Sequence, residues 1–189
     1  MVSSAAGSAT RISLRLDSTL AQLGEEGYRL SVTPSRITIL AYRPAGVFYG
    51  VETLRQLLPA EIFRAAQVPG VRWSVPAVEI EDKPRFPWRG AHLDVSRSFM
   101  PKEFVKKYID LLALHKMNRF HWHLTDDQGW RLDIKKYPRL TTVGGWRRQT
   151  LVGIQRSYRD TSEWVFDGRA HGGFYTQDDA REIVAYAKA

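Results

Sequence analysis

Three early segments of the chain alternate hydrophobic and polar residues with the two-residue period of a half-buried β-strand. They are residues 11–16, 28–32 and 37–41. Thr33, Pro34 and Ser35 separate the second segment from the third, so we expect a hairpin there. Hydrophobic residues then recur at helical spacing from Val47 to Leu58, and Pro59 ends that run. A further alternation at residues 71–75 predicts another strand, and strands with one covering helix indicate a small α+β domain.

The pattern changes in residues 81–87, where charged residues and prolines are typical of a linker. Beyond it, residues 90–95 and 119–124 form short apolar segments that predict strands. Pro101 opens a helix predicted to reach His115, and Thr176 is the predicted N-cap of a last helix. The predicted apolar faces of these helices hold Phe104, Tyr108, Leu111 and Leu112 in the first, and Ala180, Ile183, Val184 and Ala187 in the second.

The order strand, helix, strand, helix predicts parallel β/α units. A closed β/α barrel needs eight strands and about 250 residues, so two units do not complete one. We therefore predict an α/β protein in two parts: a small α+β domain over residues 1–83, then the first two β/α units of an incomplete (β/α)8 TIM barrel over residues 84–189. On this reading the chain is a fragment of a larger domain, shortened at its N-terminal end as well.

Composition narrows the classes of function. A chain of 189 residues with 43% hydrophobic and 25% charged residues is ordinary for a globular protein. The formal charge is +8, but no five basic residues follow one another, which argues against a nucleic-acid partner. The absence of cysteine excludes disulfides and thiolate metal sites. No signal peptide and no apolar run of about 20 residues is visible, so no membrane partner is expected and the compartment stays open.

Candidate chemistry gathers where the two later strands end. His121 and His123 are two residues apart on a predicted strand, so both rings lie on one face. Such a pair can bind zinc or iron, with Asp126 as the nearby third candidate, or it can simply pack and form hydrogen bonds. Arg97 follows the first strand, and its guanidinium suits two sugar hydroxyls or a carboxylate, unless it is an ordinary surface arginine. His171, in the long loop, is either exposed or placed to orient a neighbouring acid.

Several longer motifs carry a resemblance to a known family. They are PAGVFYGVETLRQL at residues 44–57, RGAHLDVSRSF at 89–99, KMNRFHWHLTDDQGWR at 116–131, YPRLT at 137–141 and GGFYTQ at 172–177. In this order they resemble glycoside hydrolase family 20, the β-N-acetylhexosaminidases. The first is similar to the helix of the small domain before the barrel, and the next two to the first two barrel strands. The similarity extends over nearly the whole chain from about residue 28.

The resemblance implies an activity: hydrolysis of terminal β-linked N-acetylglucosamine or N-acetylgalactosamine with retention. The family uses substrate-assisted catalysis, in which the acetamido oxygen of the sugar replaces an enzyme nucleophile. By motif, Arg97 is expected to bind hydroxyls of the terminal sugar, and Asp126 and His171 to support the general acid. No cofactor and no metal is implied. The expected partner is an amino-sugar oligosaccharide or glycoconjugate, and family members are often exported.

The sequence departs from the family in one respect: no Asp-Glu dipeptide occurs in these residues, although the family's acid and its acetamide-orienting partner form one. We expect that pair beyond Ala189, so no catalytic residue is assigned here and the chain alone is expected to be inactive. Two alternatives stay open, a metal-dependent barrel hydrolase that uses His121 and His123, and a non-catalytic sugar-binding fragment. Self-association through exposed strand edges is a further expectation.

Overall fold

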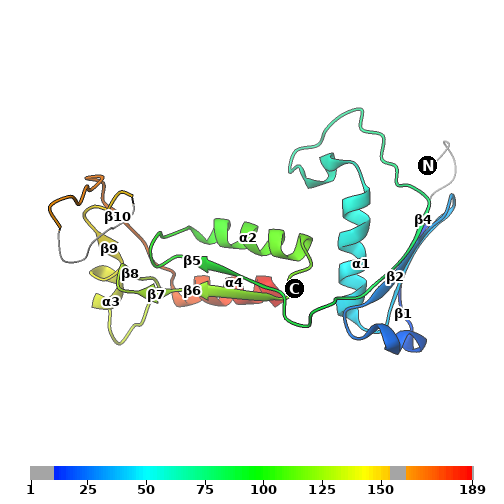
Figure 1. Ribbon diagram of the computed structural model, residues 1–189, viewed down its shortest axis with the longest axis horizontal. Coiled ribbons are helices and arrows are strands. Elements are labelled where there is room, and N and C mark those ends of the chain that lie inside the picture. The colour runs from blue at the N-terminus through cyan, green and yellow to red at the C-terminus, as the bar shows by residue number, and fades with distance from the viewer. Residues whose placement is uncertain (1–10, 154–160, 189) are drawn as a thin grey trace. The chain divides into compact units, whose positions relative to one another are not determined.

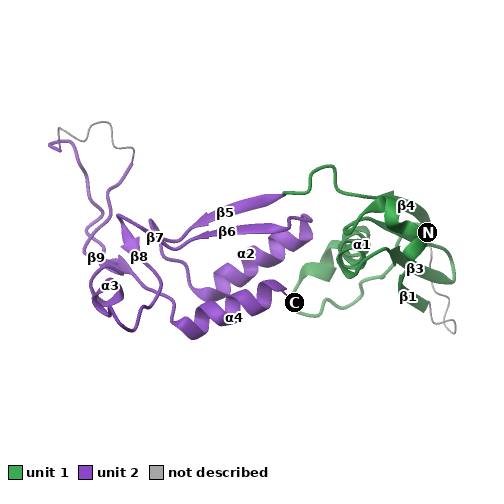
Figure 2. Ribbon diagram, turned by 90° about the horizontal axis from the view of Figure 1, so that it is seen from below, with its two compact units in different colours: residues 1–88 green, residues 89–189 purple. Residues whose placement is uncertain are grey.

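The computed structural model describes residues 11–153 and 161–188. The chain divides into two compact units, residues 1–88 and 89–189 (Figure 2). The predicted boundary after residue 83 lies in the segment that joins the last strand of the first unit to the first strand of the second. None of the described helices combines the length and the apolar character needed to cross a membrane.

The first unit is a four-stranded sheet with one long helix packed on it (Figure 1). Its strands are β1 (Arg11–Leu16), β2 (Tyr28–Val32), β3 (Arg36–Ala41) and β4 (Val78–Asp82), and its helices are η1 (Ser18–Leu23), α1 (Pro44–Leu57) and η2 (Ala60–Phe63). The sheet order is β1-β3-β2-β4, with β1 parallel to β3 and the other pairs antiparallel. The predicted hairpin of β2 and β3 is confirmed, and the Thr33 N–H donates to the Arg36 carbonyl to close it.

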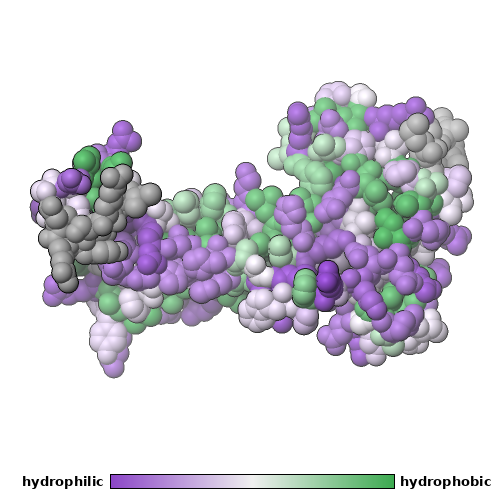
Figure 3. Space-filling model, in the orientation of Figure 1, coloured by the Kyte–Doolittle hydropathy of each residue, from purple (hydrophilic) through white to green (hydrophobic). Residues whose placement is uncertain are grey.

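The core of this unit lies between α1 and the two central strands. Leu30 and Ile39 are register partners, and both are fully buried there. The neighbouring edge strand is different, because Leu14 pairs in register with Ile39 yet remains 52% exposed. Green patches of hydrophobic residues are accordingly visible on the surface of the first unit in Figure 3. Alternation along β1 therefore predicted the strand correctly but not the exposure of its apolar face.

The fourth strand does not lie at its predicted position. The alternation at residues 71–75 predicts a strand, but the described strand is β4, and its last residues belong to the segment predicted to be a linker. Ile80 pairs with Leu30, and the Asp82 carboxylate accepts a 3.0 Å hydrogen bond from the Tyr28 hydroxyl. Glutamates alternate with the apolar residues of β4, and that high charge concealed a strand at the sheet edge.

The second unit contains a two-stranded parallel sheet, β5 (Gly90–Asp94) and β6 (Arg119–His123). Two helices, α2 (Lys102–Leu114) and α4 (Gln177–Lys188), lie side by side on one face of it (Figures 1 and 2). Leu93 and Trp122 lie on the covered face, where they pack with Val105 and Ile183. The capping role predicted for Thr176 is confirmed, because its hydroxyl accepts a 3.0 Å hydrogen bond from the Asp179 N–H.

The buried faces of both helices agree with the prediction only in part, because Ile183 is buried as expected and other predicted residues are exposed. In α2 the fully buried residue is Val105, whereas Phe104 and Leu111 are exposed. In α4 the buried residue is Ile183, and its neighbour Val184 is half exposed. Pro101 is the N-cap of α2 and not its first helical residue, a shift of one position.

The long connection between β6 and α4 contains short elements where the sequence predicted only a loop. They are β7 (Thr125–Asp126), β8 (Gly129–Trp130), α3 (Arg139–Thr142), β9 (Trp146–Arg147) and β10 (His171–Gly172). β7 pairs with β8 and β9 with β10, both antiparallel. Pairs of two residues are too short to leave a periodic pattern in the sequence. A barrel built on β5 and β6 remains a prediction.

Candidate functional site

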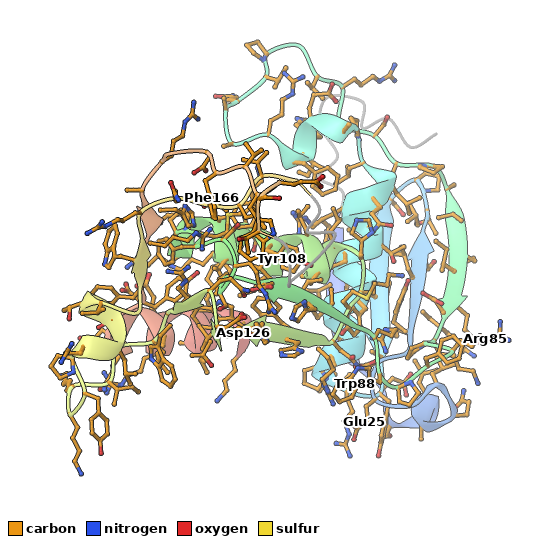
Figure 4. The ribbon with its side chains drawn as sticks, turned by 60° about the vertical axis from the view of Figure 1, so that its left-hand side comes forward. Glu25, Arg85, Trp88, Tyr108, Asp126 and Phe166 are labelled. Carbon is orange, nitrogen blue, oxygen red and sulfur yellow. The ribbon has the colours of Figure 1, made fainter. Side chains whose placement is uncertain are left out.

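Four polar side chains meet beyond the carboxyl ends of β5 and β6. Asp94 ends β5, Arg97 lies in the turn after it, and His123 ends β6. Asp126 lies in β7 and is labelled in Figure 4. Because parallel strands bring their carboxyl ends to the same edge of a sheet, side chains from the two strand ends come within bonding distance. We call Asp94, Arg97, His123 and Asp126 the strand-end cluster.

Arg97 is the centre of the strand-end cluster. Its Nη1 lies 2.6 Å from Oδ2 of Asp126, 3.2 Å from Oδ2 of Asp94 and 3.3 Å from Nε2 of His123. All three contacts use one nitrogen of the guanidinium. Within the described residues, Nε and Nη2 of Arg97 make no protein hydrogen bond, so two nitrogens of the planar guanidinium remain to donate to another molecule.

The carboxylates of the cluster are held in their ionised form. The Asp127 N–H donates to Asp126 over 2.8 Å, His123 lies 3.0 Å away, and with Arg97 these groups lower the pKa of Asp126 to about 2. Partial burial opposes ionisation of Asp94, but N–H donors from Ser96 and Arg97 and the Arg97 charge leave its pKa lowered. These carboxylates in turn raise the pKa of Arg97 in spite of its desolvation.

His171 lies in β10, and among the described residues its ring hydrogen-bonds to a backbone N–H and not to an acid. The Phe99 N–H donates to its Nε2 over 2.9 Å. Burial lowers the pKa of His171, and the charges of Arg147 and Arg131 lower it further, with Asp167 acting in the opposite direction. The sequence pointed to Asp126 and His171 as joint supports of an acid. In the part of the chain that the structure describes, no hydrogen bond joins the two.

A second group of polar residues lies on the sheet face that α2 and α4 leave uncovered. His92 pairs in register with His121, and His123 follows on the same face. Their ring centroids lie 4.6 to 5.8 Å apart, and one ligand nitrogen from each lies within 4.8 Å of the others. The sequence pattern indicated Asp126 as the third metal candidate, whereas in the structure the third residue of the group is His92.

Sequence reasoning found part of this arrangement. Arg97 and Asp126 were expected at neighbouring strand ends and lie there in contact. Asp94 was missed as a partner of Arg97, although an acid three residues before an arginine at a strand end is a signal for such a pair. Arg131 was also missed: it is fully buried and bonds to the turn after β5 and to the segments that flank β9 and β10.

Comparison with protein families gives two matches that together span nearly the whole chain. Residues 2–83 match the model described as glycosyl hydrolase family 20, domain 2. Residues 86–189 match the model described as glycosyl hydrolase family 20, catalytic domain.

Individual relatives agree with these matches. A β-hexosaminidase of Porphyromonas gingivalis is 46% identical over 169 residues, which are 89% of this chain and 20% of that protein. A β-hexosaminidase of Akkermansia muciniphila is 38% identical over 96% of this chain and 32% of its own length. The solved N-acetyl-β-hexosaminidase of Streptomyces plicatus has a TM-score of 0.75 at 44% identity, covering 94% of this chain and 31% of that one. The chain thus spans between a fifth and a third of the length of these relatives.

Proposed function

This chain belongs to glycosyl hydrolase family 20, and on that premise we propose that it supplies the sugar-binding side of a β-N-acetylhexosaminidase site. The proposal rests on the geometry of Arg97. Asp94 and Asp126 fix one nitrogen of its guanidinium, and the other two nitrogens can donate to a ligand. A fork fixed in this way suits neighbouring hydroxyls on one sugar ring. A solved exo-β-N-acetylglucosaminidase from Vibrio harveyi is 35% identical, with a TM-score of 0.74 over 94% of this chain and 25% of that one. It is a complex with N-acetylglucosamine, which supports an amino sugar as the ligand here.

The mechanism we propose is the substrate-assisted one. The acetamido oxygen of the bound sugar attacks its own anomeric carbon while a carboxylic acid protonates the leaving oxygen. In this scheme Arg97 fixes the ring, and Asp126 and His171 support the acid. Asp126 is held as an anion by His123, Arg97 and the Asp127 N–H, so it orients its neighbours and does not donate a proton itself.

The test of sugar binding uses this chain and free N-acetylglucosamine. We expect chemical-shift changes at the strand-end cluster on titration, and Arg97→Ala to weaken binding by roughly 10- to 100-fold, the loss of one or two charged hydrogen bonds. Arg97→Lys should recover only part of the affinity, because an ammonium has no fork. Arg181→Ala, at an exposed ion pair on α4, is the matched control. Equal affinity in the Arg97 and Arg181 variants would reject the proposal.

Turnover is a separate question. Because these 189 residues contain no Asp-Glu dipeptide, we propose that they bind the sugar without hydrolysing it. A chromogenic β-N-acetylglucosaminide should give no product above the uncatalysed rate. Hydrolysis that disappears in Asp126→Ala would contradict this part of the proposal and leave the sugar site intact.

A second candidate function rests on His92, His121 and His123. Three histidines are a zinc ligand set with one open position for water, the arrangement of catalytic zinc sites. Tetrahedral zinc needs ligand nitrogens about 3.4 Å apart, so the three rings would have to rotate inward. Zinc titration of the wild type and of His92→Ala distinguishes the two functions. Stoichiometric zinc binding that is lost in the variant would favour a metal-dependent hydrolase. If the wild type binds no zinc, the amino-sugar site remains as the candidate function.

A further inference from the structure

The buried guanidinium of Arg131 has no carboxylate partner among the described residues. Its side chain is 0% exposed, and its hydrogen bonds all go to backbone carbonyls: Nε to Val95 over 2.9 Å, Nη2 to Ser96 over 2.6 Å, and Nη1 to Gly145 over 2.5 Å and Gly173 over 3.1 Å. A buried charge is costly unless its donors are satisfied. A buried arginine at this position therefore calls for a structural explanation.

The four carbonyls belong to segments that are far apart in the sequence. Val95 and Ser96 form the turn after β5, which leads to Arg97 and Phe99. Gly145 precedes β9 and Gly173 follows β10, and the Gly173 N–H donates to the Gly145 carbonyl over 3.0 Å. One side chain thus links the turn after β5 to the β9–β10 pair. The planar guanidinium can do this because its three nitrogens donate in several fixed directions.

The hydrogen bond of His171 crosses the same junction. Phe99, three residues after Ser96, donates its N–H to Nε2 of His171, two residues before Gly173. The contact is close: a Cβ on Gly173 would lie 2.4 Å from the Phe99 ring, and Gly173 has φ +148°. Nitrogen that accepts a hydrogen bond carries no proton, so a His171 ring held this way is neutral and has its proton on Nδ1.

We propose that Arg131 is a positioning residue: by clamping the turn after β5 to the β9–β10 pair, it lets the Phe99 N–H fix His171 as the neutral tautomer protonated on Nδ1. The clamp and the tautomer are properties of this chain and do not depend on the proposed function. The role of His171 does rest on the proposed function, because there its Nδ1–H would donate in a fixed direction to the general acid.

The charges around His171 favour the same protonation state. Arg147 is the register partner of His171 in β9, and Arg131 lies directly after β8. The positive charges of both arginines disfavour a protonated imidazole. Asp167, before β10, acts in the opposite direction. Together with burial, these groups leave the pKa of His171 lowered, so the ring remains neutral around pH 7.

The first test is nitrogen NMR of the histidine rings in this chain, with His171 assigned by its loss in His171→Gln. At about pH 7 to 8 we expect an unprotonated Nε2, a protonated Nδ1 and a coupling across the hydrogen bond from the Phe99 amide. The exposed His115 serves as the reference for a ring that averages its tautomers. A proton on Nε2 of His171, or averaging like that of His115, would overturn the proposal.

The second test concerns the clamp. Separate, slowly exchanging guanidinium signals are expected for Arg131, whereas those of the exposed Arg181 should average. In Arg131→Lys one ammonium cannot serve all four carbonyls, so His171 should shift to mixed tautomers, and Arg181→Lys should leave it unchanged. Averaged Arg131 signals, or an unaltered His171 in a folded Arg131→Lys, would refute the clamp. If Arg131→Lys does not fold, the wild-type signals decide. No sugar or turnover enters either test, so its failure is distinct from failure of the amino-sugar site.

Discussion

One carboxylate illustrates how much of the site depends on single residues. Oδ2 of Asp126 contacts both Arg97 and His123, and Oδ1 accepts the Asp127 N–H, so every strong contact of Asp126 favours its anion. Because a carboxylate only accepts, Asp126 favours a proton on the Nε2 of His123 that faces it. The 3.3 Å approach of Arg97 Nη1 to that nitrogen is then a contact between two donors and not a hydrogen bond. Asp126 therefore orders the strand-end cluster through its contacts with Arg97, His123 and the Asp127 N–H.

This predicts a pH dependence for Asp126. Its folded pKa of about 2 lies below the ordinary 3.8, so ionisation stabilises the fold above about pH 4, and that contribution is lost as the pH falls toward 2. The carboxyl carbon signal of Asp126 should titrate near pH 2. Asp126→Asn should show a shallower loss of stability than wild type over that interval, measured by urea unfolding. Parallel acid profiles for the two proteins would contradict the prediction.

For single residues, the sequence predicts contacts between side chains at neighbouring strand ends. It does not predict contacts that a long loop brings together. Arg97 and Asp126 could be predicted because parallel strands align their ends. The partner of His171 is a backbone N–H 72 residues away, and a backbone group leaves no signature in the sequence. Arg131 is hidden for the same reason, since its four partners are carbonyls.

Among the elements, strands were predicted well where alternation was clean, as in β2 and β3, and poorly where charge masked it, as in β4. The helices were found, but their buried faces were predicted only in part: Ile183 of α4 is buried as expected, whereas Phe104 and Leu111 of α2 are exposed. In α2, Phe104, Val105, Leu111 and Ile109 spread apolar character around more than one face, so the residue that becomes buried depends on where the sheet lies. Tertiary packing, which the sequence pattern does not contain, decides that rotation.

The first sheet offers a matched pair of substitutions. Ile39 and Leu14 are register partners on one face, but Ile39 is 0% exposed and Leu14 is 52% exposed. Ile39→Ala should lower the free energy of unfolding by about 3 kcal/mol, because it leaves a cavity under α1. Leu14→Ala should change it by less than about 1 kcal/mol. Urea unfolding followed by far-UV circular dichroism measures both, and similar losses would show that β1 is covered in solution.

On the scale of the whole molecule, the division into two units was anticipated from the charged, proline-containing segment, which the structure places between β4 and β5. A change of composition marks such a segment because it lacks the apolar pattern that either core requires. The matches to two family models divide within it as well, one ending at residue 83 and the other beginning at residue 86.

Limited proteolysis checks this division. Trypsin under native conditions should cut first after Arg85, since the adjacent Phe86 is exposed and no helix or strand includes it. Two fragments that resist further digestion are expected. Arg85→Gln should delay their appearance, and Arg55→Gln, within α1, should not. Early cleavage inside a described helix or strand of either unit would show that the unit is packed more loosely than described.

The parallel pair β5–β6 has a consequence for the behaviour of the purified protein. In the described part of the chain these strands pair only with each other, so each presents its outer rim to solvent. Mutual repulsion from the net charge of +8 keeps copies apart in dilute buffer, and added electrolyte screens it. Light scattering should therefore report growing particles as sodium chloride is raised, so that storage at low ionic strength preserves monomers. Insensitivity to salt would mean that these rims are already protected.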